Sequence, residues 1–221
     1  MRLAVLFSGG KDSAFAAYLA KKQNHDLTCL ISINSKNPDS YMFHTPSITK
    51  VKKQAQFMGV PLVEQSTEGK EETELKDLQI AINKAIKKYS IQGIVTGAIE
   101  SVYQSVRIQK ICNSLGLEVF NPLWQKDQLE LLDDLIKNEF EVIITGVAAY
   151  GLDASWLGKT IDKQFIKNIA LLNKKYKINP AGEGGEFESF VVNCPLFSKK
   201  IMIKGKTISG SGNNYRMEVL L

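Results

Sequence analysis

The chain has 221 residues, of which 44% are hydrophobic and 23% charged, and its formal net charge is +5. This length is enough to bury a full core in one large domain or two small ones, and the composition is that of an ordinary soluble globular protein. Lysines are spread over predicted helix faces without a basic run that contains aromatic residues. We therefore expect no stable nucleic-acid partner.

The three cysteines, Cys29, Cys112 and Cys194, are far apart and include no Cys-x-x-Cys pair. This spacing indicates neither a zinc site nor an iron–sulfur site, and it fits small buried residues in a reducing compartment. No apolar stretch approaches the length of a membrane-spanning helix, and the first apolar run is too short for a signal peptide. We therefore expect a cytoplasmic protein without membrane contact.

The most informative segment is Ser8-Gly-Gly-Lys-Asp-Ser13. It follows an apolar run, residues 3–7, that predicts a buried strand, and it precedes residues 14–20, which predict a helix. The first amides of a helix have no partner within the helix and its dipole is positive at this end, so such a turn can bind an anion. The alternative is a plain Gly-rich turn with a capping serine.

Each residue of this segment suits a phosphate group. Gly9 and Gly10 let the backbone approach phosphate oxygens closely. Lys11 adds a positive charge, and the hydroxyls of Ser8 and Ser13 add donors. Asp12 has a carboxylate that can face Mg²⁺.

The first half of the chain alternates predicted strands and helices. The strands are 3–7, 27–33, 61–63 and 93–96, and the helices are 13–22, 48–58 and 71–88. This order predicts an α/β fold with a doubly wound, mainly parallel sheet and helices on both faces. Ligands bind at the carboxyl ends of the strands in such sheets. We therefore expect three loops to meet at one crevice, those at Ser8–Ser13, Ser32–Asn34 and Gly97–Glu100.

The second half changes character near Asn121-Pro122. We expect helices at 127–138 and 159–176 and strands at 141–147, 190–193 and 215–221, with a hairpin that turns at Lys204-Gly205. This pattern predicts a smaller α+β domain. The domains are then 1–120 and 121–221.

A second informative segment precedes one of these strands. Glu183, Glu186 and Glu188 lie within six residues, together with Gly184 and Gly185. Closely spaced carboxylates can hold a cationic substrate, bind Mg²⁺ or accept a proton. The alternative is a solvated acidic turn.

Three further positions carry weaker signals. Gly97 follows a predicted strand and allows close approach to a ligand. Gln104 and Arg107 share one face at the start of a predicted helix, where Arg107 suits a phosphate group, although a surface arginine fits equally well. His44 lies in the loop after the second strand, and a lone histidine is usually structural.

Together these stretches resemble the diphthine–ammonia ligase family, which belongs to the N-type ATP pyrophosphatases. The resemblance spans nearly the whole chain and rests on Ser8–Ser13, Met42–Pro46, Thr96–Ile99 with Tyr103, Gln104 and Arg107, Pro122–Trp124, Gly151-Leu152 with Trp156–Gly158, and Gly182–Glu188. One position departs from the family pattern, because Val102 stands where the family commonly has aspartate. The chain is similar to the compact archaeal type.

The resemblance implies a fold of the adenine-nucleotide alpha-hydrolase-like type and a reaction. The carboxylate of diphthine, a modified histidine of translation elongation factor 2, attacks the α-phosphate of ATP, and ammonia then displaces AMP. Domain 1–120 would bind ATP and domain 121–221 the substrate. The implied cofactors are ATP and Mg²⁺, the implied partners are ammonia and the diphthine-bearing factor, and a homodimer is allowed.

The resemblance also assigns expected roles to residues. The catalytic set is Lys11, Asp12, Arg107 and Glu186, with Asp12 as the metal ligand. Nucleotide binding falls to Ser8, Gly9, Gly10, Lys11, Asp12, Ser13, Ser32, His44, Gly97 and Gln104. Substrate binding falls to Tyr103, Glu183, Gly184, Gly185, Glu186 and Glu188.

Two other functions fit the same phosphate-binding loop. One is an enzyme that adenylates another substrate such as a tRNA base, which would need a concentrated basic surface or redox cysteines. The other is a non-catalytic nucleotide-binding module, which gives no reason for the acidic Gly-rich segment.

Overall fold

The computed structural model describes residues 1–35, 37 and 48–221. The chain forms two compact units, Met1–Trp124 and Gln125–Leu221. Within the described part of the chain, no helix has both the length and the apolar character needed to cross a bilayer.

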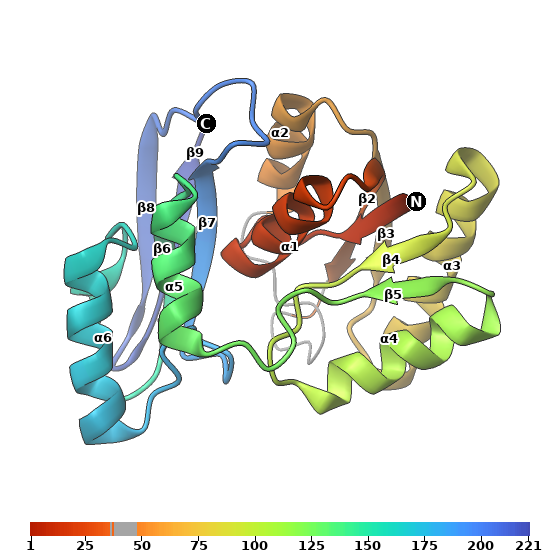
Figure 1. The fold of residues 1–221 in the computed structure, drawn as a ribbon. Helices are drawn as coiled ribbons and strands as arrows, with labels where there is room; N and C mark the ends of the chain where they lie inside the picture. The colour runs from red at the N-terminus through yellow and green to blue at the C-terminus, as the bar shows by residue number, and fades with distance from the viewer. Residues whose placement is uncertain (36, 38–47) are drawn as a thin grey trace. The chain divides into compact units, whose positions relative to one another are not determined.

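The first unit is built on a five-stranded sheet in the order β3-β2-β1-β4-β5, in which every neighbouring pair is parallel (Figure 1). Its strands are β1 (Arg2–Leu6), β2 (Asp26–Ser35), β3 (Leu62–Thr67), β4 (Gly93–Val95) and β5 (Glu118–Phe120). The chain moves outward from β1 through β2 to β3, and then returns to add β4 and β5 on the other side. This reversal confirms the doubly wound α/β fold that the sequence predicts, with its switch point between β1 and β4.

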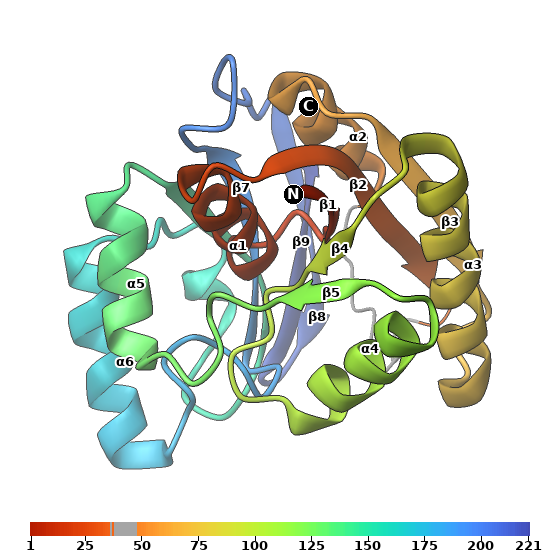
Figure 2. The same ribbon diagram turned by 45° about the vertical axis from the view of Figure 1, so that its right-hand side comes forward.

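Four helices cover the two faces of this sheet. They are α1 (Lys11–Lys22), α2 (Ile48–Met58), α3 (Glu71–Tyr89) and α4 (Val102–Ser114). Leu78 and Ile82 of α3 and Ile108 of α4 share one buried cluster with Ala4 and Ile31 of the sheet. The ribbons place α3 and α4 on this face, and α1 and α2 on the other (Figures 1 and 2). Right-handed crossovers on both sides of β1 require this arrangement.

The second unit contains a four-stranded antiparallel sheet in the order β7-β6-β9-β8. Its strands are β6 (Glu141–Ala148), β7 (Phe187–Asn193), β8 (Gly205–Ser211) and β9 (Asn214–Leu220). The helices α5 (Gln128–Lys137) and α6 (Lys163–Tyr176) lie side by side (Figure 2). Phe165 of α6 meets Phe187 of β7 edge to face at 5.7 Å between ring centres, so α6 packs on the sheet.

Two details of the second unit differ from the sequence-based expectation. The hairpin turns at Gly212-Asn213, between the paired Ser211 and Asn214, whereas Gly205 begins β8. Gly212 has φ +60°, a conformation that glycine adopts without strain. The helix expected from residue 159 begins at Lys163, because the Asp162 side chain accepts a hydrogen bond from the Phe165 amide and caps it there.

Candidate active site

The loop that follows β1 leads directly into the amino end of α1. Gly9 has φ +81°, and Gly10 is the N-cap residue of the helix. Because glycine has no side chain, the cap residue itself covers none of the first helix amides. These amides and the positive end of the helix dipole together favour an anion at this position.

Two serines close the loop from either end. The hydroxyl oxygens of Ser8 and Ser13 lie 3.2 Å apart, and the Ser13 hydroxyl donates a hydrogen bond to the Gly10 carbonyl. The Gly10 amide donates to the Ser8 hydroxyl. The loop is therefore ordered by its own side chains.

Lys11 and Asp12 form an ion pair at the first turn of α1. The Lys11 ammonium lies 2.8 Å from Asp12 Oδ2, and the Lys11 side chain is only 4% exposed. The other carboxylate oxygen, Asp12 Oδ1, is buried and accepts no hydrogen bond from the residues that the structure describes. A buried carboxylate oxygen of this kind is a suitable ligand for a hard cation such as Mg²⁺.

Gln54 of α2 contacts the loop from one side. Its side chain is fully buried, and its Nε2 donates a 3.0 Å hydrogen bond to the carbonyl oxygen of Gly9. No sequence motif marks this residue. The available signal was a polar residue between Val51 and Ala55, which both lie on the buried face of α2.

Gly97 contacts the same loop from a different direction. A Cβ atom at Gly97 would lie 2.7 Å from the carbonyl carbon of Asp12 and 2.8 Å from the amide nitrogen of Ser13. Gly97 therefore packs against the backbone of the first turn of α1. A side chain at this position would displace the loop itself.

Ser32 and His44 were also expected in loops at this edge of the sheet. Ser32 is buried inside β2, which continues to Ser35, so residues 32–34 belong to the strand and not to a loop. His44 lies outside the described residues.

The start of α4 carries three of the expected site residues. Ser101 caps the helix by accepting a hydrogen bond from the Gln104 amide. The Arg107 guanidinium stacks on the Tyr103 ring with its Cζ 3.4 Å from the ring centre, and its Nη1 donates to the Tyr103 carbonyl. These contacts hold the guanidinium in one orientation. Val102, which departs from the aspartate common in the family that the sequence resembles, is 62% exposed.

Glu186 organises the acidic segment of the second unit. Its Oε1 accepts hydrogen bonds from the backbone amide and the side-chain amide of Asn179, and its Oε2 accepts one from the Gly184 amide, each at 2.8 Å. Gly185, with φ +82°, turns the chain immediately before Glu186. Strand β7 begins at Phe187, directly after Glu186 and three residues before the start at 190 that the sequence predicts.

Glu188 lies on the sheet of the second unit. It pairs with Gly146 of β6, where a Cβ atom would come within 2.7 Å of Glu188 Oε2. The carboxylate therefore occupies the space that a side chain at Gly146 would fill. Glu183 is partly buried, while Gly184 and Gly185 are exposed.

The buried side chain of Gln128 ties this segment to α5. Its Oε1 accepts a 2.9 Å hydrogen bond from the Ala181 amide, and its Nε2 lies 3.4 Å from Asn179 Oδ1. Asn179 in turn donates to Glu186. A chain of hydrogen bonds thus joins the helix to the acidic turn.

Burial raises the pKa of the Cys29 thiol to about 12 and those of Cys112 and Cys194 to about 11. All three remain protonated near neutral pH. The cysteines thus behave as small buried residues, as the sequence predicts.

Comparisons with known proteins cover both units. The model of the diphthamide synthase N-terminal domain matches residues 1–119, and that of the diphthamide synthase C-terminal domain matches residues 127–217. The chain is 35% identical to diphthine–ammonia ligase from Bos taurus and 34% identical to that from Homo sapiens, in each case over 94% of this chain and 85% of the relative. It is 36% identical to diphthine–ammonia ligase from Rattus norvegicus, over 92% of this chain and 83% of the relative. With both domain models matched in order and relatives aligned over most of their length, the chain belongs to the diphthamide synthase family.

Proposed function

We propose that the protein is an ATP-dependent ligase that converts diphthine to diphthamide. The carboxylate of diphthine displaces pyrophosphate from the α-phosphate of ATP and forms an acyl-adenylate. Ammonia attacks the acyl carbon, AMP leaves, and one proton is released. The observation that carries this proposal is the uncapped amino end of α1 beside the buried Lys11, in a chain whose two units match the two domains of this family.

The loop after β1 supplies the electrostatic part of the first step. Negative charge grows on the departing pyrophosphate, and donors fixed in advance stabilise it best. The amides at the start of α1, the Lys11 ammonium and the Ser8 hydroxyl are such donors, and Ser13, whose hydroxyl donates to the Gly10 carbonyl, holds the loop around the phosphates. Gly9 and Gly10 let phosphate oxygens approach the backbone.

Mg²⁺ fits this loop through Asp12. We propose that Asp12 Oδ1, which is buried and accepts no hydrogen bond from the described residues, would hold the ion. The described residues contain no cluster of three histidine, cysteine or acidic side chains that could hold a metal, which fits an ion that takes its other ligands from phosphates and water. When bound, Mg²⁺ neutralises charge on the phosphates.

The remaining first-unit residues have proposed roles around the nucleotide. Arg107, held against Tyr103, offers a guanidinium to the α-phosphate, and Gln104 lies on the same helix turn. Gly97 keeps the loop in place through its contact with the Asp12–Ser13 backbone. Ser32 and His44 remain proposed nucleotide contacts.

The acidic segment is proposed to receive the acceptor. Diphthine carries a quaternary ammonium, which carboxylates attract. Glu183 and Glu188 are the proposed acidic lining, and the exposed Gly184 and Gly185 leave room for a side chain that belongs to another protein. The three hydrogen bonds accepted by Glu186 support a role in shaping this turn.

The proposed partner is translation elongation factor 2 that carries diphthine, and the proposed compartment is the cytoplasm. Pyrophosphate release with and without this factor tests the function. Release that depends on the factor and accompanies its amidation is expected. Release stimulated by tRNA would favour adenylation of a base, and nucleotide binding without any turnover would favour a non-catalytic module.

A further inference from the structure

Helix α2 presents a fully buried amide to the loop after β1. Gln54 Nε2 donates a 3.0 Å hydrogen bond to the Gly9 carbonyl, across 45 positions of the chain. An amide on the buried face of a helix requires hydrogen-bond partners, because an unsatisfied buried polar group is costly. The loop carbonyl supplies one of them.

The α-carbon of Gly9 also lies close to the Gln54 side chain. A Cβ atom there would lie 2.4 Å from Gln54 Oε1 and 3.2 Å from Val51 Cγ2. Gly9 therefore lies directly against α2, in a conformation with φ +81° that other residues rarely adopt. A side chain at position 9 would therefore have to displace the Gln54 amide and adopt a strained backbone conformation.

Peptide geometry turns this contact into an effect on phosphate binding. The Gly9 carbonyl and the Gly10 N–H belong to one planar trans unit and point in opposite directions. A carbonyl held toward α2 therefore directs the Gly10 N–H away from α2, where it meets the Ser8 hydroxyl. A flipped unit would instead present a carbonyl oxygen to the phosphates, which repels them.

We propose that Gln54 is a positioning residue for ATP, one that holds the Gly9–Gly10 peptide so that its N–H and not its carbonyl faces the phosphates. This proposal rests on the proposed function of the loop as the phosphate site. Gln54 acts through the loop backbone and requires no contact with ATP. The proposal predicts an effect on ligands with phosphates and little effect on those without.

The test compares ATP and adenosine binding to the full-length protein by titration calorimetry. Gln54→Met keeps the volume of the side chain and removes the donor, and Gln56→Met, at an exposed position of the same helix, is the matched control. We expect Gln54→Met to weaken ATP binding at least tenfold (about 1.4 kcal/mol or more) and adenosine binding less than twofold. Equal losses for both ligands, or unchanged ATP affinity, would overturn the proposal.

A second variant provides a rescue. In Gln54→Glu the ionised carboxylate cannot donate to the Gly9 carbonyl, whereas the protonated acid can. The ratio of ATP to adenosine affinity should therefore recover as the pH is lowered, relative to the same ratio in the parent protein. A ratio that does not change with pH would overturn the proposal. Thermal melting that shows both Gln54→Met and Gln54→Glu to be unfolded would also overturn it, because Gln54 would then serve only the packing of the core. ATP binding without amidation by the parent protein would instead contradict the proposed function and leave this proposal standing.

Discussion

The Lys11 ammonium lies 2.8 Å from Asp12 Oδ2, and the two side chains share the first turn of α1. Lys11 is almost completely buried there, so its charge is little screened by solvent. The pair leaves the second oxygen of Asp12 for another ligand. A fixed cation and a carboxylate oxygen thus lie together at the helix end that favours phosphate.

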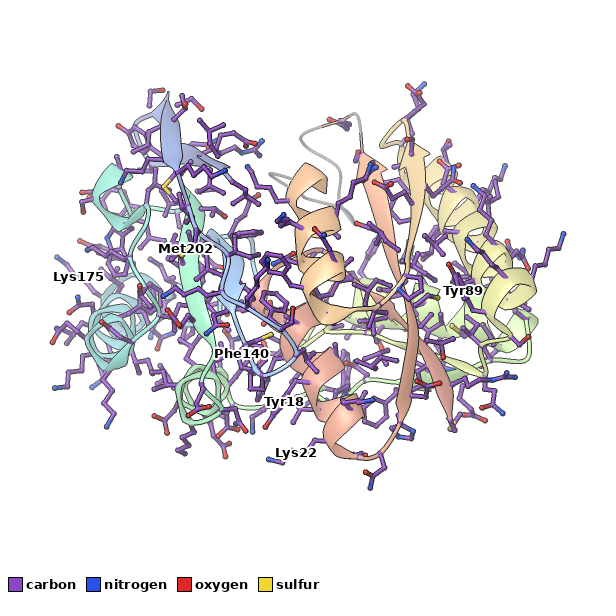
Figure 3. All side chains as sticks on the ribbon, turned by 90° about the horizontal axis from the view of Figure 1, so that it is seen from above. Tyr18, Lys22, Tyr89, Phe140, Lys175 and Met202 are labelled. Atoms are coloured by element: carbon purple, nitrogen blue, oxygen red, sulfur yellow. The ribbon has the colours of Figure 1, made fainter. Side chains whose placement is uncertain are left out.

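Replacement of Lys11 tests the electrostatic role of this turn. Lys11→Met should lower kcat for pyrophosphate release about 100-fold or more, a loss typical of a removed transition-state donor. Lys22→Ala is the matched control, because Lys22 lies at the far end of the same helix, 5.7 Å from the centre of the Tyr18 ring (Figure 3). A Lys11→Met enzyme with the activity of the control would refute the role.

Gly97 is expected to tolerate no side chain. Gly97→Ala places a Cβ atom within 3 Å of the Asp12 and Ser13 backbone, which has little room to move. The loop should shift, and ATP affinity should fall at least tenfold in a titration. Gly205→Ala, where the nearest atom is the end of the Leu220 side chain at 3.3 Å, is the control. Unchanged ATP affinity in a folded Gly97→Ala protein would show that the loop does not depend on this contact.

The variant Glu186→Gln tests whether the second unit contributes to amidation and not to ATP binding. The amide group can accept with its oxygen only, so one of the three donors from Asn179 and Gly184 loses its partner and the acidic turn loosens. ATP affinity should stay within twofold of the parent, while amidation of diphthine-bearing elongation factor 2 should fall at least tenfold. Glu130→Gln, at an exposed position of α5, is the control. A loss of ATP binding by a folded Glu186→Gln protein contradicts the assignment.

The ion pair between Lys200 and Glu141 predicts a pH dependence of stability. The hydrogen bonds from Lys200 and Asn193 lower the pKa of Glu141 in the folded protein. The contribution of charged Glu141 to the free energy of unfolding is therefore complete above the pKa of the unfolded state, about 4.3. It is lost as the pH falls through the lower pKa of the folded state. Both side chains are more than a third exposed, so the contribution is at most about 1 kcal/mol.

Denaturant unfolding of the parent and Glu141→Gln checks this. The parent should be slightly more stable at pH 7, and the difference should shrink as the pH is lowered below about 4. A difference that stays constant down to acid pH would mean that the charge of Glu141 does not contribute.

The sequence predicts the parts of the fold and site that depend on local signals. The apolar run before Ser8 and the glycines after it define a strand, a turn and a helix within twenty residues, and the structure has all three. The three-residue strand β5 is too short to show a pattern and was not predicted. The hairpin offered two glycine turns, at Gly205 and Gly212, and only the pairing of β8 with β9 selects the second.

Long-range contacts account for the other misses. Gln54 lies 45 positions from Gly9, and its role follows from the packing of α2 and not from any motif. Gly97 was expected to allow close approach of a ligand, and the structure adds that the backbone of α1 lies against it, a contact that no local pattern shows. Strand β7 begins at Phe187, three residues earlier than predicted, because its pairing with β6 extends to Val147.

Ligase activity is tested most directly by a reaction of the purified protein with ATP, Mg²⁺, ammonia and diphthine-bearing elongation factor 2. Mass spectrometry of the modified histidine peptide follows conversion of the acid to the amide, and AMP and pyrophosphate are measured in the same sample. We expect amidation with one AMP and one pyrophosphate per converted factor, and no amidation without ATP. ADP and phosphate as products, or turnover of ATP that leaves the factor unmodified, would contradict it.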